Sequence, residues 1–212
     1  MSKVVITGNA SGTGDFTIAA PNSNTDRTLT LPDEAGTVLT TAGVPSSAMP
    51  AGTILQVQTT NVSTSGSQSV TANTYFEITG VSVSITPSST SSKILLQGSW
   101  FGEPSNSAFE YNHMFSFRRD TTYLGCPVDG SRRVGIAMAT RTNLNTDAGS
   151  TPISLGVMQY VDTPATTSEI TYKLFCVGQY TMTLYNNRTV ADANAADYER
   201  GMSMITAMEI AA

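Results

Sequence analysis

Hydrophobic and polar residues alternate along two neighbouring stretches of the chain, ISLGVMQYV at residues 153–161 and ITYKLFCVGQYTMTLY at residues 170–185. Alternation with a period of two is typical of a strand with one buried face. The linking segment DTPATT contains Pro164, whose fixed φ suits a turn. We expect the two stretches to pair as a long antiparallel hairpin, with Gly178 marking a bend or a break in its second strand. The positions assigned to the buried face are Ile153, Leu155, Val157, Val161, Ile170, Tyr172, Leu174, Cys176, Tyr180, Met182 and Leu184.

Shorter stretches of the same kind recur from about residue 53 to the C-terminus. Met202, Met204, Met208 and Ile210 alternate in the last of them, which we expect to be a core strand. Several short strands separated by turns are typical of a sandwich or barrel. The pattern predicts an all-β fold, an antiparallel, jelly-roll-like β-sandwich, in which only residues 190–198 could form a helical turn. Besides the three strands of residues 153–185, strands are expected at residues 53–60, 75–86, 93–101, 113–118, 133–140 and 202–210.

The apolar pattern changes parity at Gly80. Phe76 and Ile78 share one parity, whereas Val81 and Val83 share the other. One extra residue in a strand restores the buried face, and glycine tolerates the backbone that this requires. We therefore expect a β-bulge at Gly80.

Residues 1–50 differ from the rest, because their apolar segments are short and are separated by Gly-, Asn- and Ser-rich links. The segment TLTLPDEAGTVLT predicts a small hairpin, which is marginal in water unless other chains hold it. We expect residues 1–50 to be an anchor or oligomerisation segment with a linker, and residues 51–212 to be the sandwich domain. The candidate anchor residues are Leu29, Leu31, Pro32, Gly36, Val38 and Leu39.

Composition narrows the function further. Only 13% of the 212 residues are charged and the formal net charge is −5, so nucleic acid and anionic membranes are not expected partners. No secretory leader and no long apolar run is visible, which predicts synthesis in a reducing cytoplasm without membrane insertion. We expect Cys126 in a turn and Cys176 as a small buried residue, with no disulfide between them.

The sequence gives little support to enzymatic chemistry. His113, the sole histidine, is in phase with Phe115 and Phe117 and is interpreted as a packed residue. No HExxH or CxxC motif is present, so we expect no transition-metal site and no cofactor. Three acids in one loop could hold Ca²⁺, and four others could supply paired carboxylates for glycan cleavage, but we interpret both sets as solvated acids. These sets are Asp192, Asp197 and Glu199, and Glu103, Glu110, Asp120 and Asp129.

Aromatic residues on predicted loops and strand ends are candidates for contact with carbohydrate or with another subunit, because a tyrosine or tryptophan combines a large apolar face with a polar tip. Packing in the core or at an interface is the more frequent use of such residues. No receptor-binding residue is therefore assigned. The candidates are Trp100, Phe101, Phe109, Tyr111 and Tyr198.

Four segments resemble structural proteins of tailed bacteriophages. FEITGVSVSITPSSTSSKILLQGS, YVDTPATTSEIT and SMITAMEIA resemble the C-terminal domains of virion proteins, and TLTLPDEAGTVLT resembles the N-terminal units of tail-fibre and related appendage proteins. The resemblance implies a structural or receptor-facing role on the virion, usually as a homotrimer attached through its N-terminal segment.

Three functions follow as expectations. The first is a non-enzymatic short tail fibre or fibre-like appendage, with a trimeric knob facing the host surface and its glycans. The second is a capsid decoration or cement protein that clamps shell subunits, and the third, less favoured, is a glycan depolymerase. Trimerisation would bury the apolar part of the opposite register of the central strands, so Phe175, Val177 and Tyr185 are the candidate interface residues.

Overall fold

The computed structural model describes residues 11–15, 17, 22–26, 28, 44–105, 112–139 and 152–212. The chain divides into Met1–Leu39 and Thr40–Ala212, so this division falls before the boundary expected near residue 50. The six candidate anchor residues all lie outside the described residues. The fold described below is that of the second unit.

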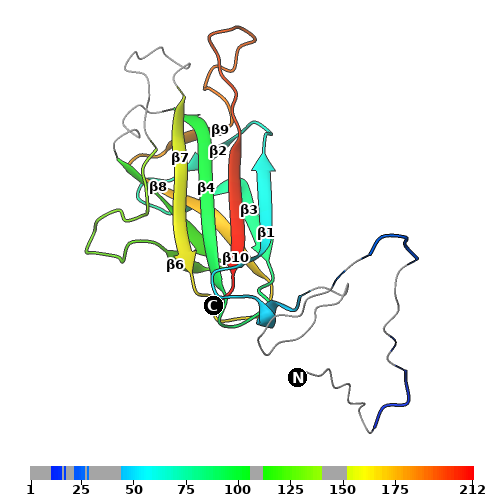
Figure 1. Cartoon of the computed structure of the whole chain (residues 1–212). Coiled ribbons are helices and arrows are strands. Elements are labelled where there is room, and N and C mark those ends of the chain that lie inside the picture. Colours follow the sequence, from blue (N-terminus) through cyan, green and yellow to red (C-terminus); the bar gives the residue numbers. More distant parts are fainter. Residues whose placement is uncertain are drawn as a thin grey trace. The chain divides into compact units, whose positions relative to one another are not determined.

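Two antiparallel sheets build this unit (Figure 1). The front sheet runs β1-β10-β4-β9-β2, and β7 also pairs with β4; the back sheet runs β3-β8-β5-β6. The all-β class predicted from the sequence is confirmed, and the helical structure among the described residues is the short 3-10 turn Ser46–Ala48. The strands are β1 (Ile54–Val62), β2 (Gly66–Val70), β3 (Phe76–Ile85), β4 (Lys93–Pro104), β5 (His113–Arg119), β6 (Thr122–Leu124), β7 (Ile153–Asp162), β8 (Ile170–Gly178), β9 (Met182–Asn186) and β10 (Ser203–Ile210).

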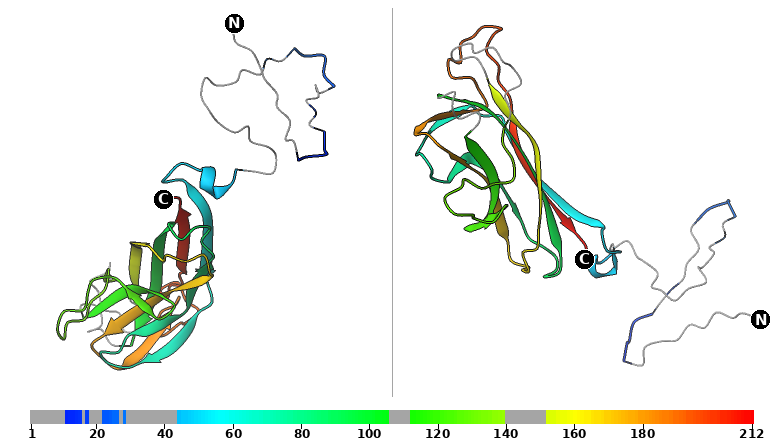
Figure 2. Two further views of the ribbon diagram at one scale, coloured as in Figure 1. Left: turned by 90° about the horizontal axis from the view of Figure 1, so that it is seen from below. Right: turned by 90° about the vertical axis from the view of Figure 1, so that its left-hand side faces the viewer.

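One hydrophobic core joins the facing sides of the two sheets, which lie as separate layers in the edge-on view of Figure 2. Trp100 of β4 is 1% exposed, and its ring centroid lies 5.4 Å from that of Phe115 in β5. The indole Nε1–H donates to Oδ1 of Asn186 over 2.8 Å, so the polar edge of this buried ring is satisfied. From β8, the core takes the alternating residues expected from the sequence, namely Ile170, Tyr172, Leu174 and Cys176.

The predicted bulge at Gly80 is confirmed. The pairing of β3 with β8 shifts register between Glu77 and Ser82, and Gly80 has a φ of +82°. Because of this shift, both Ile78 and Val81 are buried although their parity differs.

The predicted hairpin of residues 153–185 is wrong. β7 pairs with β4 in the front sheet, whereas β8 pairs with β3 and β5 in the back sheet. Alternation shows that a strand has one buried face, but it does not select the neighbouring strand. The break at Gly178 is confirmed, because β8 ends there and the chain crosses to β9 in the front sheet.

Two strands turn to their outer face some of the apolar residues that the sequence placed in the core, whereas Ile153 and Leu155 of β7 are buried as expected. In β10 the inner face carries the buried residues Ser203, Ile205, Ala207 and Glu209, so the methionines lie on the opposite, outer face, where Met204 and Met208 are half-buried and Thr206 is buried. In β7 the register shifts opposite Gly98 and Trp100, where Gly156 adds one residue to the strand. Val157 and Val161 are thereby turned outward, 69% and 51% exposed.

Other expectations also fail. The expected strand at 133–140 is reduced, within its described part, to the isolated bridge between Phe115 and Ala137. β2 and β6 arise in segments that look polar and turn-like in sequence, and residues 190–198 form bends and turns instead of a helical turn.

The chain enters the β unit and ends at the same end of it (Figure 1). Gly52 N–H donates to Ala211 O, and Ala211 N–H donates to Thr53 O. The loop that joins β9 to β10 lies at the opposite end. None of the described helical structure is long and apolar enough to span a membrane.

Candidate functional site

His113 is a packed residue in β5. Its Nε2 accepts a hydrogen bond from Ala139 N–H over 2.9 Å, and its ring meets Phe115 edge-to-face at 5.5 Å. An open groove of about 350 Å³ passes beside it, lined also by Arg132, Arg133 and Met138. Because Nε2 is occupied as an acceptor, the imidazole holds the segment at Ala139 rather than presenting a base to the groove.

The candidate acids are engaged with separate local partners. Glu103 is buried and its Oε2 accepts from Val190 N–H over 2.7 Å, which fixes the start of the β9–β10 loop. Asp120 accepts from Thr171 N–H, and Asp129 pairs with Arg132 on the surface. Glu110 lies outside the described residues.

The loop proposed as a Ca²⁺ candidate is held by arginines. Asp192 accepts a bidentate pair of hydrogen bonds from Arg200, both 2.9 Å, and also pairs with Arg188 at 3.3 Å. Arg188 in turn lies over the ring of Tyr185, 4.5 Å from its centroid. Two cations therefore neutralise the carboxylate that a Ca²⁺ ion would need. In the described part of the chain, no cluster of acidic, histidine and cysteine side chains has the arrangement of a metal site.

A buried carboxylate closes the other end of the unit. Glu209 of β10 accepts from Ser88 N–H and Oγ and from Ser92 Oγ, each over 2.7 Å, and from Gln56 Nε2 over 2.6 Å. Burial of the carboxyl raises its pKa, but the hydrogen bonds from Gln56, Ser92 and Ser88 outweigh this and lower the pKa below the usual glutamate value. Glu209 thus ties the turn after β3 to the first and last strands.

A second buried acid joins the two sheets. Asp162 ends β7 in the front sheet and pairs with Arg119 of β5 in the back sheet through hydrogen bonds of 2.9 and 2.8 Å. Tyr172 of β8 donates its hydroxyl to the same carboxylate over 2.7 Å. Burial and this hydrogen bond raise the pKa of the Tyr172 phenol well above its ordinary value. The DTP segment is therefore the crossing between the sheets, clamped at its first residue.

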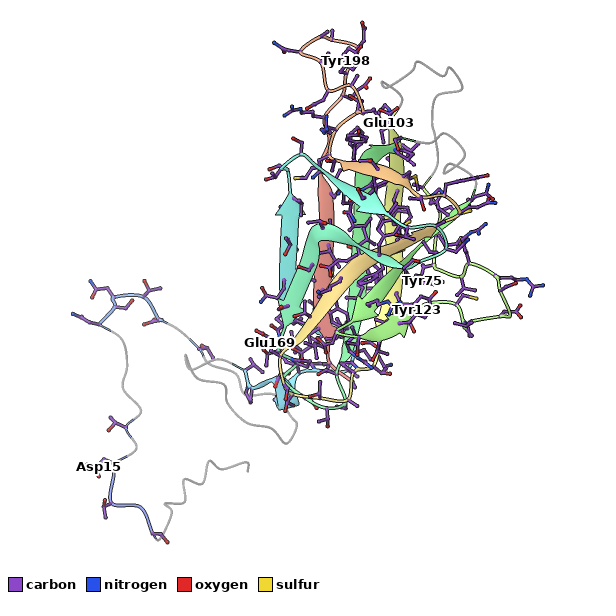
Figure 3. All side chains as sticks on the ribbon, turned by 180° about the vertical axis from the view of Figure 1, so that it is seen from behind. Asp15, Tyr75, Glu103, Tyr123, Glu169 and Tyr198 are labelled. Carbon is purple, nitrogen blue, oxygen red and sulfur yellow. The ribbon has the colours of Figure 1, made fainter. Side chains whose placement is uncertain are left out.

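Aromatic rings surround an arginine on the outer side of the back sheet. Arg118 Cζ lies 4.8 Å from the ring centroid of Phe175, 5.5 Å from that of Tyr75 and 5.8 Å from that of Tyr123. The two tyrosine rings meet edge-to-face at 5.7 Å, and Figure 3 shows them side by side. Burial of the phenol, with Tyr75 next to it, raises the pKa of Tyr123 to about 12. Tyr75 also accepts from Val134 N–H and donates to Val134 O, so this cluster holds the segment after β6 against the sheet.

The three predicted trimer-interface residues are not equivalent. Val177 is 1% exposed and is already covered within one chain, which leaves it no surface for a subunit contact. Phe175 and Tyr185 are half-buried, each against an arginine. Of the aromatic contact candidates, Trp100 belongs to the core, Phe101 and Tyr198 are half-buried, and Phe109 and Tyr111 lie outside the described residues.

No family model matches the chain, and no curated protein matches it.

The residues with the most polar contacts were not selected from the sequence. Glu209 and Asp162 each stand in phase with buried apolar neighbours, Ile205 and Ala207 for the first and Met158 for the second. An acid in the apolar register of a strand is the signal that could have marked them, because such an acid requires hydrogen-bond donors inside the fold.

Proposed function

We propose that this chain is a non-enzymatic structural protein of a tailed-phage virion, a short tail fibre or fibre-like appendage. Its N-terminal segment attaches to the particle, and its β unit is a trimeric knob that faces the host surface. The supporting observation is that the attachment end and the β9–β10 loop lie at opposite ends of the β unit.

The separation of these two ends follows from β10. The strand runs from Ser203, where the loop ends, to Ile210, beside the hydrogen bonds between Ala211 and the entering chain. At about 3.3 Å per residue, its length separates the two ends by roughly 26 Å. The loop itself is braced by the ion pairs of Asp192 and by the buried Glu103. A chain attached at the first end would therefore hold a preorganised loop away from the particle.

The buried polar side chains of the β unit support a structural role. Glu209, Asp162 and His113 each connect elements that are distant in sequence. Groups whose hydrogen bonds hold strands and turns together are the usual reason for buried polar residues in a rigid domain.

We propose further that the fold is a jelly-roll sandwich. A jelly roll has eight strands in two sheets built from two Greek keys. Without β2 and β9, eight strands remain, and we number them one to eight in chain order. The sheet β1-β10-β4-β7 then has the order one, eight, three, six, and the other sheet is β3-β8-β5-β6. This second sheet has the order two, seven, four, five. Two Greek keys produce these two orders.

The experiment that tests the virion assignment is antibody labelling of intact particles of the phage that encodes this chain, imaged by electron microscopy. We expect label on the tail. Label on the head would replace the proposal with the capsid-decoration function, and an absence of label on particles whose protein is detected only in the infected cell would overturn a virion role.

The host-facing role is tested by competition for adsorption. The purified full chain is expected to block adsorption of the phage, and Tyr198→Ala in the β9–β10 loop is expected to weaken the block. Glu169→Ala, at the opposite end in Figure 3, is the matched control and should compete like the wild type. Equal competition by both variants would remove Tyr198 from the receptor contact, and release of reducing ends from host polysaccharide would overturn the non-enzymatic assignment.

A further inference from the structure

The outer face of the front sheet carries a row of apolar side chains. The strand registers place Val57 of β1 beside Met208 of β10, Met208 beside Leu95 of β4, and Leu95 beside Val161 of β7. Val57 and Val161, at the two ends of the row, are each 51% exposed. Figure 1 views this face directly, with the four strands side by side.

Apolar residues extend the row in both directions along the strands. Ile54, 54% exposed, pairs with Ile210 at the end of the unit where the chain enters. Towards the other end, Met204 lies beside Asn61 and Ser99, and Val157 is turned outward from β7. The exposed residues Ile54, Val57, Val157 and Val161 are thus gathered on one face, whereas single exposed apolar residues are normal on any surface.

Between these apolar rows the face is polar but uncharged. Thr59, Thr206, Gln97 and Gln159 form the next cross-strand row, in which Thr59 and Thr206 are hydrogen-bonded at 3.0 Å. The rows from Val57 to Val161 and from Thr59 to Gln159 contain no acid or base, and Lys93 stands at the edge, beside Ile210. This differs from the whole chain, which carries a formal charge of −5.

The size of the face is sufficient for a specific contact. Four strands about 4.8 Å apart, each paired over roughly eight residues of about 3.3 Å, present on the order of 500 Å² before side-chain relief is counted. Two such surfaces together reach about 1,000 Å², the least area that a specific protein interface is expected to bury.

We propose that this face binds other copies of the same chain. The hydroxyl of Thr59 and the amides of Gln97 and Gln159 both donate and accept hydrogen bonds, so they complement the same groups of neighbouring copies that turn this face toward a common three-fold axis. A face without charges offers nothing to a strongly charged partner, and it allows copies with a net charge of −5 to meet without like charges opposed across the contact. The inference rests on the oligomer of the proposed function and names its surface: the outer face of β1, β10, β4 and β7, in place of Val177.

The test compares the mass of full-length variants by light scattering over a concentration series. The double variant Val57→Glu/Val161→Glu places acids at both ends of the row in every copy, and we expect its self-association to be at least tenfold weaker than that of the wild type. Val128→Glu introduces the same acid at a residue that is 75% exposed outside the strands, and it should leave the mass unchanged. Trp100 fluorescence confirms that each variant is folded, because this ring is buried in the core.

A second double variant, Val57→Thr/Val161→Thr, keeps the β-branched shape and should weaken association in the same direction if the glutamate variant fails to fold. An oligomer whose mass none of these face substitutions changes would overturn this inference and leave the proposed oligomer intact. A wild-type chain that stays monomeric at concentrations of about 100 µM would overturn both this inference and the trimeric knob, whereas the labelling of virions tests the particle assignment independently.

Discussion

Ser92 donates a hydrogen bond from its hydroxyl to Oε1 of Glu209 over 2.7 Å, although the two residues are 117 positions apart in the sequence and both are buried. The turn that contains Ser92 lies between β3 and β4, and Glu209 belongs to the last strand. The turn after β3 and the end of the last strand therefore meet at one carboxylate. The contact closes the end of the unit at which the chain enters and leaves.

We predict that Glu209→Gln lowers the free energy of unfolding by about 1–3 kcal/mol. The carboxylate of Glu209 is the acceptor in all four of its hydrogen bonds. An amide nitrogen in place of one carboxylate oxygen would therefore face a donor and leave that donor unpaired. Urea denaturation followed by Trp100 fluorescence measures the loss. Glu169→Gln changes an exposed glutamate and should stay within about 0.5 kcal/mol of the wild type; an equally stable Glu209→Gln would show that the carboxylate is not needed.

The same carboxylate predicts a dependence of stability on pH. Its pKa in the folded chain lies below the ordinary value of 4.5 that it regains on unfolding, so its contribution is complete above that value. As pH falls through the folded pKa, both states become protonated and the contribution is lost. We expect the difference in unfolding free energy between wild type and Glu209→Gln to be constant near neutral pH and to shrink below about pH 4.5. A difference that persists unchanged into strong acid would contradict the assignment.

Local features of the sequence were sufficient for the all-β class and for the bulge at Gly80. The parity change and the glycine that permits it occur within a few residues, so nothing distant is needed to interpret them. Pairing partners are different, because β7 and β8 are consecutive strands in separate sheets. The contacts that hold the crossing, from Arg119 and Tyr172 to Asp162, form only when these strands are folded together.

The buried face of β10 shows the second limit. Met204 and Met208 are more apolar than Ser203 and Glu209, so hydropathy selects the wrong face of this strand. Glu209 can be buried because Ser88, Ser92 and Gln56 supply donors from two other segments. A pattern along one strand contains no information about donors elsewhere, and for this reason the carboxylate clusters and the outer apolar face became visible only in the folded chain.

Gly102 is predicted to be intolerant of any side chain. A Cβ atom at this position would overlap the carbonyl oxygen of Tyr185 and lie 2.5 Å from Cζ2 of Trp100. Gly102→Ala should therefore destabilise the unit by about 1–3 kcal/mol through displacement of β4 and β9. Gly156→Ala is the matched control, since nothing lies within 4 Å of its Cβ position, and thermal unfolding compares the two. Equal stability of both variants would mean that the backbone adjusts at no measurable cost.

The two cysteines are predicted to differ in reactivity. Cys126 is exposed and Cys176 is buried, where burial raises the pKa of its thiol well above the ordinary value. An aromatic disulfide reagent at pH 8 should modify Cys126 rapidly and Cys176 only after denaturation, because the thiolate is the reactive species. Cys126→Ser should abolish the rapid phase. Rapid modification of two thiols in the native protein would contradict the buried position of Cys176.

The hydrogen bond between Tyr172 and Asp162 at the crossing between the sheets can be tested separately from the packing of the Tyr172 ring. Tyr172→Phe removes the hydroxyl that donates to Asp162 and keeps the ring in the core, so we expect the free energy of unfolding to fall by about 1–2 kcal/mol. Asp162→Asn leaves Arg119 without its carboxylate and should lower the free energy of unfolding by about 3 kcal/mol or more. Because both substitutions act on one hydrogen bond, the double variant should be more stable than the sum of the two losses predicts, with a coupling of at least about 0.5 kcal/mol in urea denaturation. Ser84→Ala on the exposed surface of β3 provides the reference pair with Asp162→Asn, and those two losses should add. Additivity in the Tyr172 and Asp162 cycle would show that the hydrogen bond between the sheets contributes nothing to the stability of the crossing.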